Sequence, residues 1–497
     1  MTSASRIAAR EPPTAVVRTN LWFLVPTCLV TMLGGFLFGY DTGIISGAIE
    51  PLTAKFALSS FMKGWVSGCV LVGCAAGVLL VGPISDRFGR RLAMYLAAIM
   101  FFASAVGTTF PHSIQVFILF RLIGGVGIGI ASISTPMYIA EIVPAHLRGR
   151  MISGNQIMIA GGIAATAFIN YLIAHSQGSP ALPEVQHWLT ESGWRWMFAT
   201  GIVPSVLFGL LLFFVPESPR WLVEMKRDEK ARGIMGRIGG DQFADTELAG
   251  IRAALDKAKG SWVGLCSARL RLPLLVGIAL AVLQQITGIN VFMYFGATIF
   301  KNMSASTGVD AGLLQQIVIN GTCMLFTVVA ISTVDRWGRR PLLFVGASGM
   351  AASLVGMGVM AQSLADPAAA GGRMLFLIVL YIGCFGLSVG PVTWVILSEI
   401  FPTEVRGRAL GMAAFFLWLA DYAVTQTFPL MDANDSWFVR QFHHAFPFYG
   451  YAACCVLLVA LVWKYVPETK GRSLEEIGNA WKRRPRHQPM EDGAPGS

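Results

Sequence analysis

The sequence predicts an all-helical membrane protein of about twelve transmembrane helices, arranged as two pseudo-symmetric six-helix halves with short cytoplasmic helices between them. Of the 497 residues, 54% are hydrophobic and 13% are charged, and the mean hydropathy is +0.60. Soluble domains carry about 25% charged residues, so this composition indicates a polytopic membrane protein. Apolar runs recur along the chain, and charged motifs from the first half return in the second.

Each predicted span is an apolar run long enough to cross the hydrocarbon layer, which takes about 20 helical residues. The runs of the first half fall at 21–46, 63–84, 92–110, 115–140, 151–174 and 195–215. Those of the second half fall at 272–300, 312–334, 341–362, 373–400, 408–431 and 443–466. We therefore expect an N-terminal segment at 1–20, halves at 21–215 and 272–466, a linker at 216–271 and a tail at 467–497.

Basic clusters fall on alternate loops, together with both termini. They read DRFGRR (86–91), HLRGR (146–150), DRWGRR (335–340), EVRGR (404–408) and KRRPR (482–486). The positive-inside rule places these loops in the cytoplasm, so the net charge of +10 indicates topology and not nucleic-acid binding. In the linker, charged and apolar side chains alternate at helical spacing, which predicts amphipathic helices on the cytoplasmic face.

Three motifs repeat at similar offsets. DRFGRR recurs as DRWGRR after an offset of 335 − 86 = 249 residues. The pattern ExxPxxxRGR begins at Glu141 and recurs at Glu399 (399 − 141 = 258), and the Pro-Glu pair at Pro216 recurs at Pro467 (467 − 216 = 251). We interpret this as two halves of common origin in parallel orientation. Such halves place a solute site near the midplane between them and expose it to each side in turn.

The repeated motifs also predict a charged gate at the cytoplasmic ends of the spans. Glu141 and Glu399 fall near cytoplasmic helix ends, within reach of Arg87, Arg91, Arg336 or Arg339. A network joining the halves would hold the inner gate shut and break when the pore opens inward; the alternative is a set of solvated anchors, each pair worth about 0–1 kcal/mol. The predicted gate residues are Arg87, Arg91, Glu141, Arg148, Glu217, Arg336, Arg339, Glu399, Arg406 and Glu468.

One carboxylate, Asp41, falls inside the first apolar run, in the stretch LGGFLFGYDTGIIS (33–46). A carboxylate at bilayer depth costs roughly 2.5–3.5 kcal/mol, so we expect it to be paired, wetted by a cavity, or part of an ion pathway. The alternative is that Asp41 lies at the outer interface and ends the span. The nearby Gly34, Gly35, Gly39 and Gly43 predict close approach of a neighbouring helix.

Taken together, the motifs resemble the sugar porter family of the major facilitator superfamily. The matching stretches are FGYDTGIISG, DRFGRR, RLIGGVGIG, PMYIAEIVPAHLRGR, PESPRWL, QQITGIN, DRWGRR, GPVTWVILSEIFPTEVRGR and PETKGRSLEEI, from Phe38 to Ile477 in the family's order. The resemblance implies a major facilitator fold and transport of a sugar.

The resemblance also implies which residues face that sugar. QQITGIN supplies Gln284, Gln285 and Asn290, with Tyr294 one turn further on. Uncharged amides suit a polyol because they both donate and accept hydrogen bonds. On an unbroken helix Gln284 and Asn290 would lie roughly 120° apart, and we expect Gly288 to distort the helix so that both turn inward. The alternative is that these amides bond other helices.

Further positions match the family's binding residues. Trp394 resembles its stacking aromatic, and Phe38 and Gln156 match other binding positions. The substrate-binding residues that the resemblance implies are Phe38, Gln156, Ile163, Gln284, Gln285, Asn290, Tyr294, Asn320, Trp394 and Trp418.

Several positions depart from the family pattern. Ile163 stands where proton symporters often have a second Gln, as in facilitative glucose carriers, and Cys323 replaces an Asn, with Asn320 one turn away. Leu417 replaces a polar residue, and Asp421 replaces the usual Asn. These changes leave the identity of the sugar open. Asp421 is a further proton site, a partner for a base, or a wetted cavity residue.

Arg121 is the partner that the resemblance implies for Asp41. Facilitators of the glucose-carrier type have Asn at this position, and an Asn cannot titrate, so Asp41 favours proton coupling. A movement that breaks the pair would let the acid take up or release one proton. We expect no metal and no cofactor besides the coupling proton.

The sequence therefore predicts a carrier that imports a neutral monosaccharide, a hexose or pentose, by proton symport with alternating access. The alternatives are a facilitative uniporter of the same fold, favoured by Ile163, and a non-transporting sugar sensor, disfavoured by the short tail. No enzymatic motif is present. We expect the protein in the cell (inner or plasma) membrane with both termini cytoplasmic. The expected partners are the monosaccharide and the lipid bilayer, without nucleic acid and without a required oligomer.

Overall fold

The structure, a computed structural model, describes residues 19–257, 270–303, 309–362, 367–401 and 405–470. Within these ranges every regular element is helical and none is a strand. Twelve stretches of helix are long and apolar enough to cross a membrane. The predicted fold class is therefore confirmed. The predicted tail lies almost entirely outside the described residues.

The first half holds six of these spans. Five are single helices and the sixth, Pro183–Phe214, is built from five short elements. The elements are α1 (Leu21–Phe56), α2 (Ser60–Phe88), α3 (Arg90–Thr109), α4 (Ile114–Ile142), α5 (Ala145–His175), α6 (Pro183–Trp188), η1 (Leu189–Gly193), α7 (Trp194–Ala199), α8 (Ile202–Leu211) and η2 (Leu212–Phe214).

The second half holds the other six, and two of its spans are interrupted. The seventh consists of α13 and α14, and the tenth consists of α17, η3 and α18. The elements are α13 (Arg271–Ile286), α14 (Ile289–Met303), α15 (Val309–Trp337), α16 (Arg339–Gln362), α17 (Pro367–Cys384), η3 (Phe385–Val389), α18 (Gly390–Ile400), α19 (Arg406–Met431), α20 (Trp437–Phe442) and α21 (Phe446–Tyr465).

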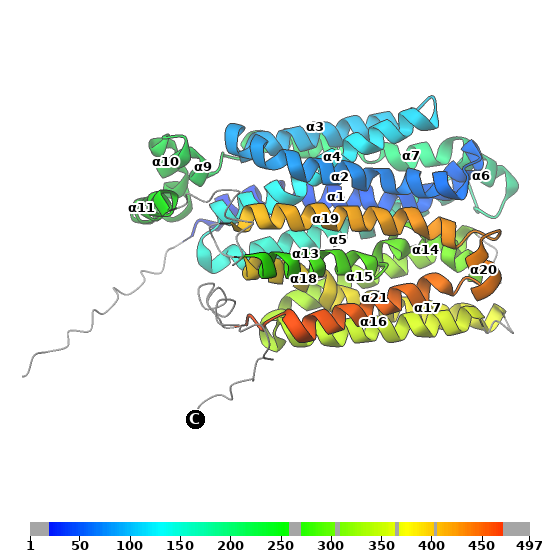
Figure 1. Cartoon of the computed structure of the whole chain (residues 1–497). Helices are drawn as coiled ribbons and strands as arrows, with labels where there is room; N and C mark the ends of the chain where they lie inside the picture. Colours follow the sequence, from blue (N-terminus) through cyan, green and yellow to red (C-terminus); the bar gives the residue numbers. More distant parts are fainter. Residues whose placement is uncertain (1–18, 258–269, 304–308, 363–366, 402–404, 471–497) are drawn as a thin grey trace, which may run out of the picture.

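Short helices join the halves, as expected for the linker. They are α9 (Pro219–Glu224), α10 (Asp228–Gly239) and α11 (Asp241–Lys257), and they pack around a small apolar core of their own that includes Trp221 and Met235. Figure 1 shows them at one end of the bundle, which we call the linker end; α6 and α20 lie at the opposite end, the loop end. The N–H of Asn20 donates to the carbonyl of Ile238 over 2.7 Å, so α10 lies beside the start of α1.

Glycines let helix backbones touch in the first half. On α1 and α5, a Cβ added to Gly39 would lie 1.9 Å from the carbonyl oxygen of Ile159, and one added to Gly162 would lie 2.2 Å from that of Phe36. Both contacts are too short for any side chain, so the two helices meet backbone to backbone. The approach predicted for the glycines of the first span is confirmed.

The same arrangement joins α2 to α4. A Cβ on Gly73 would lie 2.3 Å from the carbonyl oxygen of Leu122, and one on Gly125 would lie 2.0 Å from that of Val70. The GGVGIG stretch of α4 therefore serves helix packing, and it fixes the position of the residues that precede it, including Arg121.

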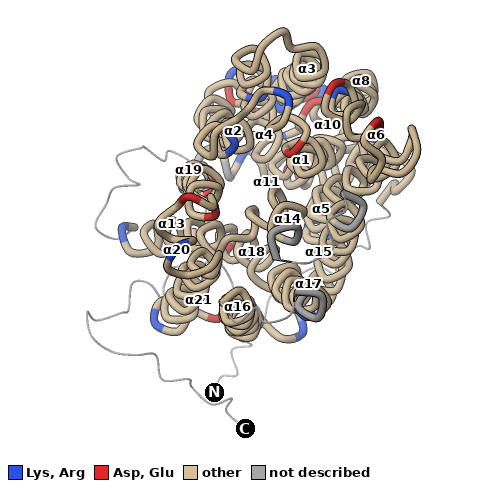
Figure 2. The backbone as a smooth tube through the Cα atoms, turned by 90° about the vertical axis from the view of Figure 1, so that its right-hand side faces the viewer, with Lys and Arg blue, Asp and Glu red and all other residues tan. Residues whose placement is uncertain are grey.

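The two halves meet at the loop end. Figure 2, seen from that end, places α19 beside α2 and α15 beside α5. The amide of Gln426 donates to the carbonyl of Phe61 over 3.0 Å, and the hydroxyl of Thr298 donates to Glu50 over 2.8 Å. At the linker end, by contrast, Gly149 of α5 has no atom within 4 Å of an added Cβ. The halves thus contact each other at the loop end.

Adjacent glycines on α5 give a direct test of the backbone contact. Gly162→Ala should destabilise the fold by about 1–3 kcal/mol, because the added methyl group overpacks the contact with Phe36. Gly161→Ala should be neutral or stabilising, because nothing lies within 4 Å of that position and Ala favours helix. Thermal unfolding of the two variants in detergent checks this, and equal melting temperatures would contradict the packing argument.

Candidate functional site

A buried ion pair joins α1 and α4. The Nη1 atom of Arg121 lies 2.6 Å from Oδ2 of Asp41. The Arg121 side chain is fully buried, whereas that of Asp41 keeps 17% of its surface. Because α1 runs on to Phe56, the helix does not end at Asp41, while the depth of Asp41 in the membrane stays a prediction. A buried pair of this kind is strongly destabilised when one partner loses its charge.

Water has room to reach this pair. A cavity of about 20 Å³ is lined by Asp41, Tyr40, Phe198 and Ser205, among others, which is enough for one water molecule. The Nε and Nη2 atoms of Arg121 have no protein partner, and the ring of Phe198 lies 5.9 Å from its guanidinium carbon. The carboxylate therefore borders a small cavity on one side and the guanidinium on the other.

The seventh span breaks where QQITGIN predicted a distortion. Gly288 has φ of +90°, α13 ends just before it at Ile286, and α14 begins just after it at Ile289. The freed carbonyl of Thr287 accepts a hydrogen bond from the Tyr381 hydroxyl over 2.9 Å. A Cβ on Gly288 would lie 2.5 Å from the Tyr451 ring, so both backbone conformation and space require glycine there.

The break brings two of the three amides into contact. The Nδ2 atom of Asn290 donates to Oε1 of Gln285 over 2.9 Å. Gln284 turns toward the tenth span, where its Nε2 donates to the carbonyl of Gly390 over 2.9 Å, and its Oε1 stays without a protein partner. Gln285 and Asn290 thus bond each other. Gln284 bonds another helix, as the alternative interpretation of these amides predicted.

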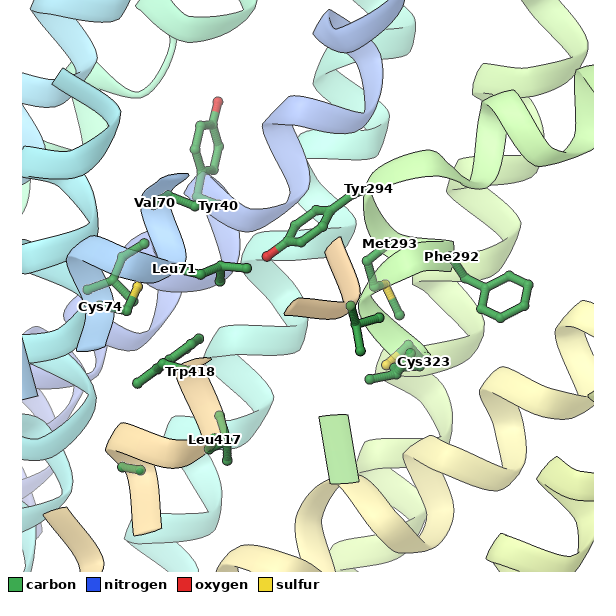
Figure 3. Packing of buried hydrophobic residues seen from close by; sticks show 14 of the residues in the cluster. Tyr40, Val70, Leu71, Cys74, Phe292, Met293, Tyr294, Cys323, Leu417 and Trp418 are labelled. Atoms are coloured by element: carbon green, nitrogen blue, oxygen red, sulfur yellow. The ribbon is translucent and has the colours of Figure 1, made fainter. Parts of the chain in front are cut away.

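The remaining predicted binding residues lie around the meeting of the halves. The rings of Phe38 and Trp418 are 5.4 Å apart, edge to face. The Nδ2 atom of Asn320 donates to the carbonyl of Ile163 over 3.2 Å. Figure 3 shows Tyr294 reaching from α14 toward Leu71 of α2, with Trp418 nearby. Gln156 and Trp394 are half-buried.

Several unpaired polar atoms of the described residues belong to the seventh, tenth and eleventh spans. They include Oε1 of Gln284, Oγ1 of Thr393, Nε1 of Trp418 and Oδ2 of Asp421, all buried. Buried polar atoms normally find a partner, so these donors and acceptors indicate a site for water or for a polar ligand. Sequence analysis missed Thr393, which stands one residue before the predicted Trp394.

At the linker end of the first half, a carboxylate joins three elements. Arg90 binds Glu141 through two hydrogen bonds of 3.0 Å, and the Ser218 hydroxyl also donates to Glu141. Glu217 accepts the backbone N–H groups of Arg90 and Arg91 at 3.0 and 3.1 Å. This set links the starts of α3 and α9 to the end of α4.

The second half repeats this arrangement. Arg339 donates to Glu399 over 3.1 Å, the Thr469 hydroxyl donates to Glu399 over 2.6 Å, and Glu468 accepts the backbone N–H groups of Arg339 and Arg340. A glycine precedes each arginine, Gly89 before Arg90 and Gly338 before Arg339, and both glycines have a positive φ. The motif thus folds the same way twice.

One expectation for the gate needs correction. Sequence analysis named Arg87, Arg91, Arg336 and Arg339 as possible partners of the two glutamates, but the partner of Glu141 is Arg90, which the repeat offset points to (339 − 249 = 90). The hydrogen bonds given above join elements of one half, and a network that joins the two halves stays a prediction for the state in which the inner gate is shut.

The other predicted gate residues bond locally. Arg87 stacks on the Phe88 ring, and Arg91 donates to carbonyls of the sixth span. Arg148 donates to the Val143 carbonyl over 3.4 Å, and the carbonyl of Arg336 accepts from Lys470. The Arg406 side chain lies outside the described residues.

The two cap glutamates differ in their electrostatics. Burial raises the pKa of Glu217 above its ordinary 4.5, although backbone N–H groups act against it. Burial also acts to raise the pKa of Glu468, but the N–H groups of Lys470, Arg340, Arg339 and Thr469 outweigh it, and the pKa is lowered. Equivalent positions therefore carry opposite pKa shifts.

Comparisons with known proteins agree with this geometry. A sequence model of the family described as sugar (and other) transporter matches residues 27–481. The D-xylose-proton symporter of Escherichia coli (strain K12) is 40% identical over 489 residues, covering 93% of this chain and 96% of that protein. The arabinose-proton symporter of Bacillus subtilis (strain 168) is 38% identical over 473 residues, covering 95% and 98%. The inward open structure of the xylose transporter XylE from Escherichia coli matches with a TM-score of 0.78 at 38% identity, covering 92% and 100%.

The cap glutamates predict opposite pH dependences of stability. Glu468→Gln should lower the free energy of unfolding by about 0.3–1 kcal/mol at pH 7. This loss should shrink as pH falls below 4.5, because protonation of Glu468 then removes the charge that the N–H groups stabilise. The loss of unfolding free energy in Glu217→Gln should instead become smaller as pH rises above 4.5, because burial disfavours the ionised form of Glu217 in the folded protein. Melting temperatures of both variants between pH 3.5 and 7 check this; parallel profiles would contradict it.

Proposed function

This chain belongs to the sugar transporter family of the major facilitator superfamily, and we propose on that basis that it imports a neutral monosaccharide together with a proton by alternating access. It is a multi-pass integral membrane protein and not an enzyme. The observation that carries the proposal is the buried Asp41–Arg121 pair, which lies in the same bundle as an uncharged amide cluster.

The amide cluster suits a sugar. Gln285 and Asn290 present donors and acceptors without a charge, and the half-buried Trp394 offers an apolar face for the C–H groups of a sugar ring. The names of the xylose and arabinose symporters support a monosaccharide substrate, a pentose or a hexose. Phe38, Gln156, Ile163, Gln284, Tyr294, Asn320 and Trp418 complete the proposed binding site.

The ion pair supplies the coupling. When Asp41 is ionised it neutralises Arg121, and when it is protonated it leaves a fully buried guanidinium without a counter-ion. Because an unpaired buried charge is costly, protonation favours a rearrangement that brings water to Arg121. The membrane potential contributes about 2.3 kcal/mol per charge per 100 mV, enough for roughly 50-fold accumulation.

The positive-inside rule sets the orientation. The basic clusters at 86–91, 146–150 and 335–340 lie at the linker end, so we propose that this end faces the cytoplasm and that both termini lie on that side of the cell membrane. With the halves in contact at the loop end, the proposed state is the inward-facing one. Each chain carries both halves of its site, so transport needs no oligomer, and nucleic acid has no part in it. In the outward-facing state the charged ends of the two halves would meet and form the inner gate.

A uniporter of the same fold is the second candidate. Ile163 favours it, because an aliphatic side chain stands where proton symporters often have Gln. The carbonyl of Ile163 still binds Asn320, so this position contributes to the contact between the halves through its backbone. Alkalinisation of the medium on addition of sugar distinguishes the two: a symporter produces it and a uniporter does not.

Substitution of the coupling acid tests the proposed symport. Asp41→Asn should lower the sugar accumulation ratio of energised vesicles by up to roughly 50-fold at about 100 mV, because the amide cannot carry the proton that Asp41 carries. Sugar exchange across the same vesicles should persist, since exchange needs no net proton movement, and it serves as the internal control. Accumulation equal to that of the native chain would refute the coupling role.

Removal of an amide tests the proposed sugar site. Gln285→Ala should raise the sugar KM roughly 2- to 10-fold, because a hydrogen bond contributes about 0.5–1.5 kcal/mol. Alkalinisation per sugar should stay unchanged, as the ion pair is intact. Gln242→Ala, on the exposed face of α11, is the matched control and should leave KM unaltered. An unchanged KM in Gln285→Ala would remove this residue from the site.

A further inference from the structure

A second carboxyl group, that of Asp421, is buried in the bundle and unused by the coupling just described. It lies on α19 with 1% of its surface exposed. The Thr425 hydroxyl donates to its Oδ1 over 3.4 Å, and the amide of Asn290 also interacts with it. Its Oδ2 has no protein partner.

The groups that the helices packed on α19 bring near Asp421 are uncharged, and the charged residues of the same region, Asp41 and Arg121, pair with each other. Of the helices packed on α19, α2 brings the Cys74 thiol and α14 brings the Tyr294 hydroxyl within electrostatic reach of Asp421. On α2 the cation nearest the loop end is Lys63, which pairs with Glu50. Charged residues of α13, α18, α20 and α21 stand toward the ends of those helices, at Arg271, Glu399, Arg440 and Lys464. In the described part of the chain no cation pairs with Asp421.

A carboxylate in such a place is disfavoured, because its side chain is buried and no cation pairs with it in the described residues. The neutral acid suits the site better. In that form Oδ1 accepts the hydrogen bond from Thr425, and an O–H on Oδ2 has no acceptor among the described residues, so it can donate to a ligand.

An acceptor for this hydrogen bond would lie in the proposed sugar site. Trp418 lies one turn before Asp421 on α19, with its own Nε1 unpaired, and Asn290 joins Asp421 to Gln285. Cys74 and Tyr294 lie within electrostatic reach of both Asp421 and Asp41, so the two acids occupy the same polar region from opposite halves.

We propose that Asp421 is a second proton-binding group, whose neutral carboxyl donates a hydrogen bond from Oδ2 to an oxygen of the bound sugar. This inference rests on the proposed function. The proton comes from the solution that the site faces, stays on Oδ2 while the sugar is bound, and returns to solution once the sugar has left and water enters. Sugar binding therefore takes up one proton at any pH at which the free site is ionised.

The proton taken up by Asp421 can be measured separately when Asp41 is replaced by an amide. Purified Asp41→Asn should bind a monosaccharide from a hexose and pentose panel with a Kd that rises roughly tenfold per pH unit once Asp421 ionises, as one linked proton requires. The double variant Asp41→Asn/Asp421→Asn should show a Kd that is flat between pH 5.5 and 8.5, because the amide donates at every pH. Proton uptake on sugar addition, followed with an indicator dye in weakly buffered solution, should be present in the first and absent in the second.

Two results would overturn the inference. One is a pH-independent Kd with no proton uptake in Asp41→Asn; the other is the same pH dependence in the double variant as in the single one. The single variant keeps Asp421 in place, so the measurement stands even where the double variant does not fold. If no sugar of the panel binds the native chain at any pH, it is the proposed function that fails, and the two failures are thus distinguishable.

Discussion

The close approach of helix backbones at glycines is the constraint on which the other features depend. Gly39 and Gly162 bring α1 against α5, and Gly73 and Gly125 bring α2 against α4, each at a distance that admits no side chain. In a bilayer, where apolar side chains gain little from burial against each other, such contacts supply much of the packing energy. They also fix the depth and rotation of α1 and α4, so that Asp41 and Arg121 face each other at 2.6 Å.

The repeated motif at the linker end makes each half a rigid unit. In both halves a glycine with positive φ turns the chain, the arginine after it binds a glutamate at the end of another span, and a second glutamate caps the new helix. Because these bonds stay within a half, they need not break when the halves move relative to each other. They support rocking of two rigid bodies about the contacts at the loop end.

The site itself combines two kinds of polar group with different roles. The charged pair sits within the first half, while the amides belong to the broken seventh span of the second half, so the proposed sites of protonation and of sugar binding lie in different halves. Asp421 belongs, like the amides, to the second half. Its burial without a counter-ion gives it the character of a neutral donor, in contrast to Asp41, whose partner stabilises the ionised form.

The sequence by itself determined the twelve spans, the two related halves, the linker helices and the break at Gly288, because each follows from local hydropathy, repetition or backbone freedom. It also indicated that Asp41 needs a partner at that depth, and the resemblance to the sugar porter family pointed to Arg121. Only the tertiary structure decided that Arg90 and not Arg87 holds Glu141, that the hydrogen bonds of the charged sets join elements of one half, and that the hydroxyl of Thr393 is buried without a partner. These depend on which helix faces meet, and side-chain partners across helices are set by packing that no local pattern specifies.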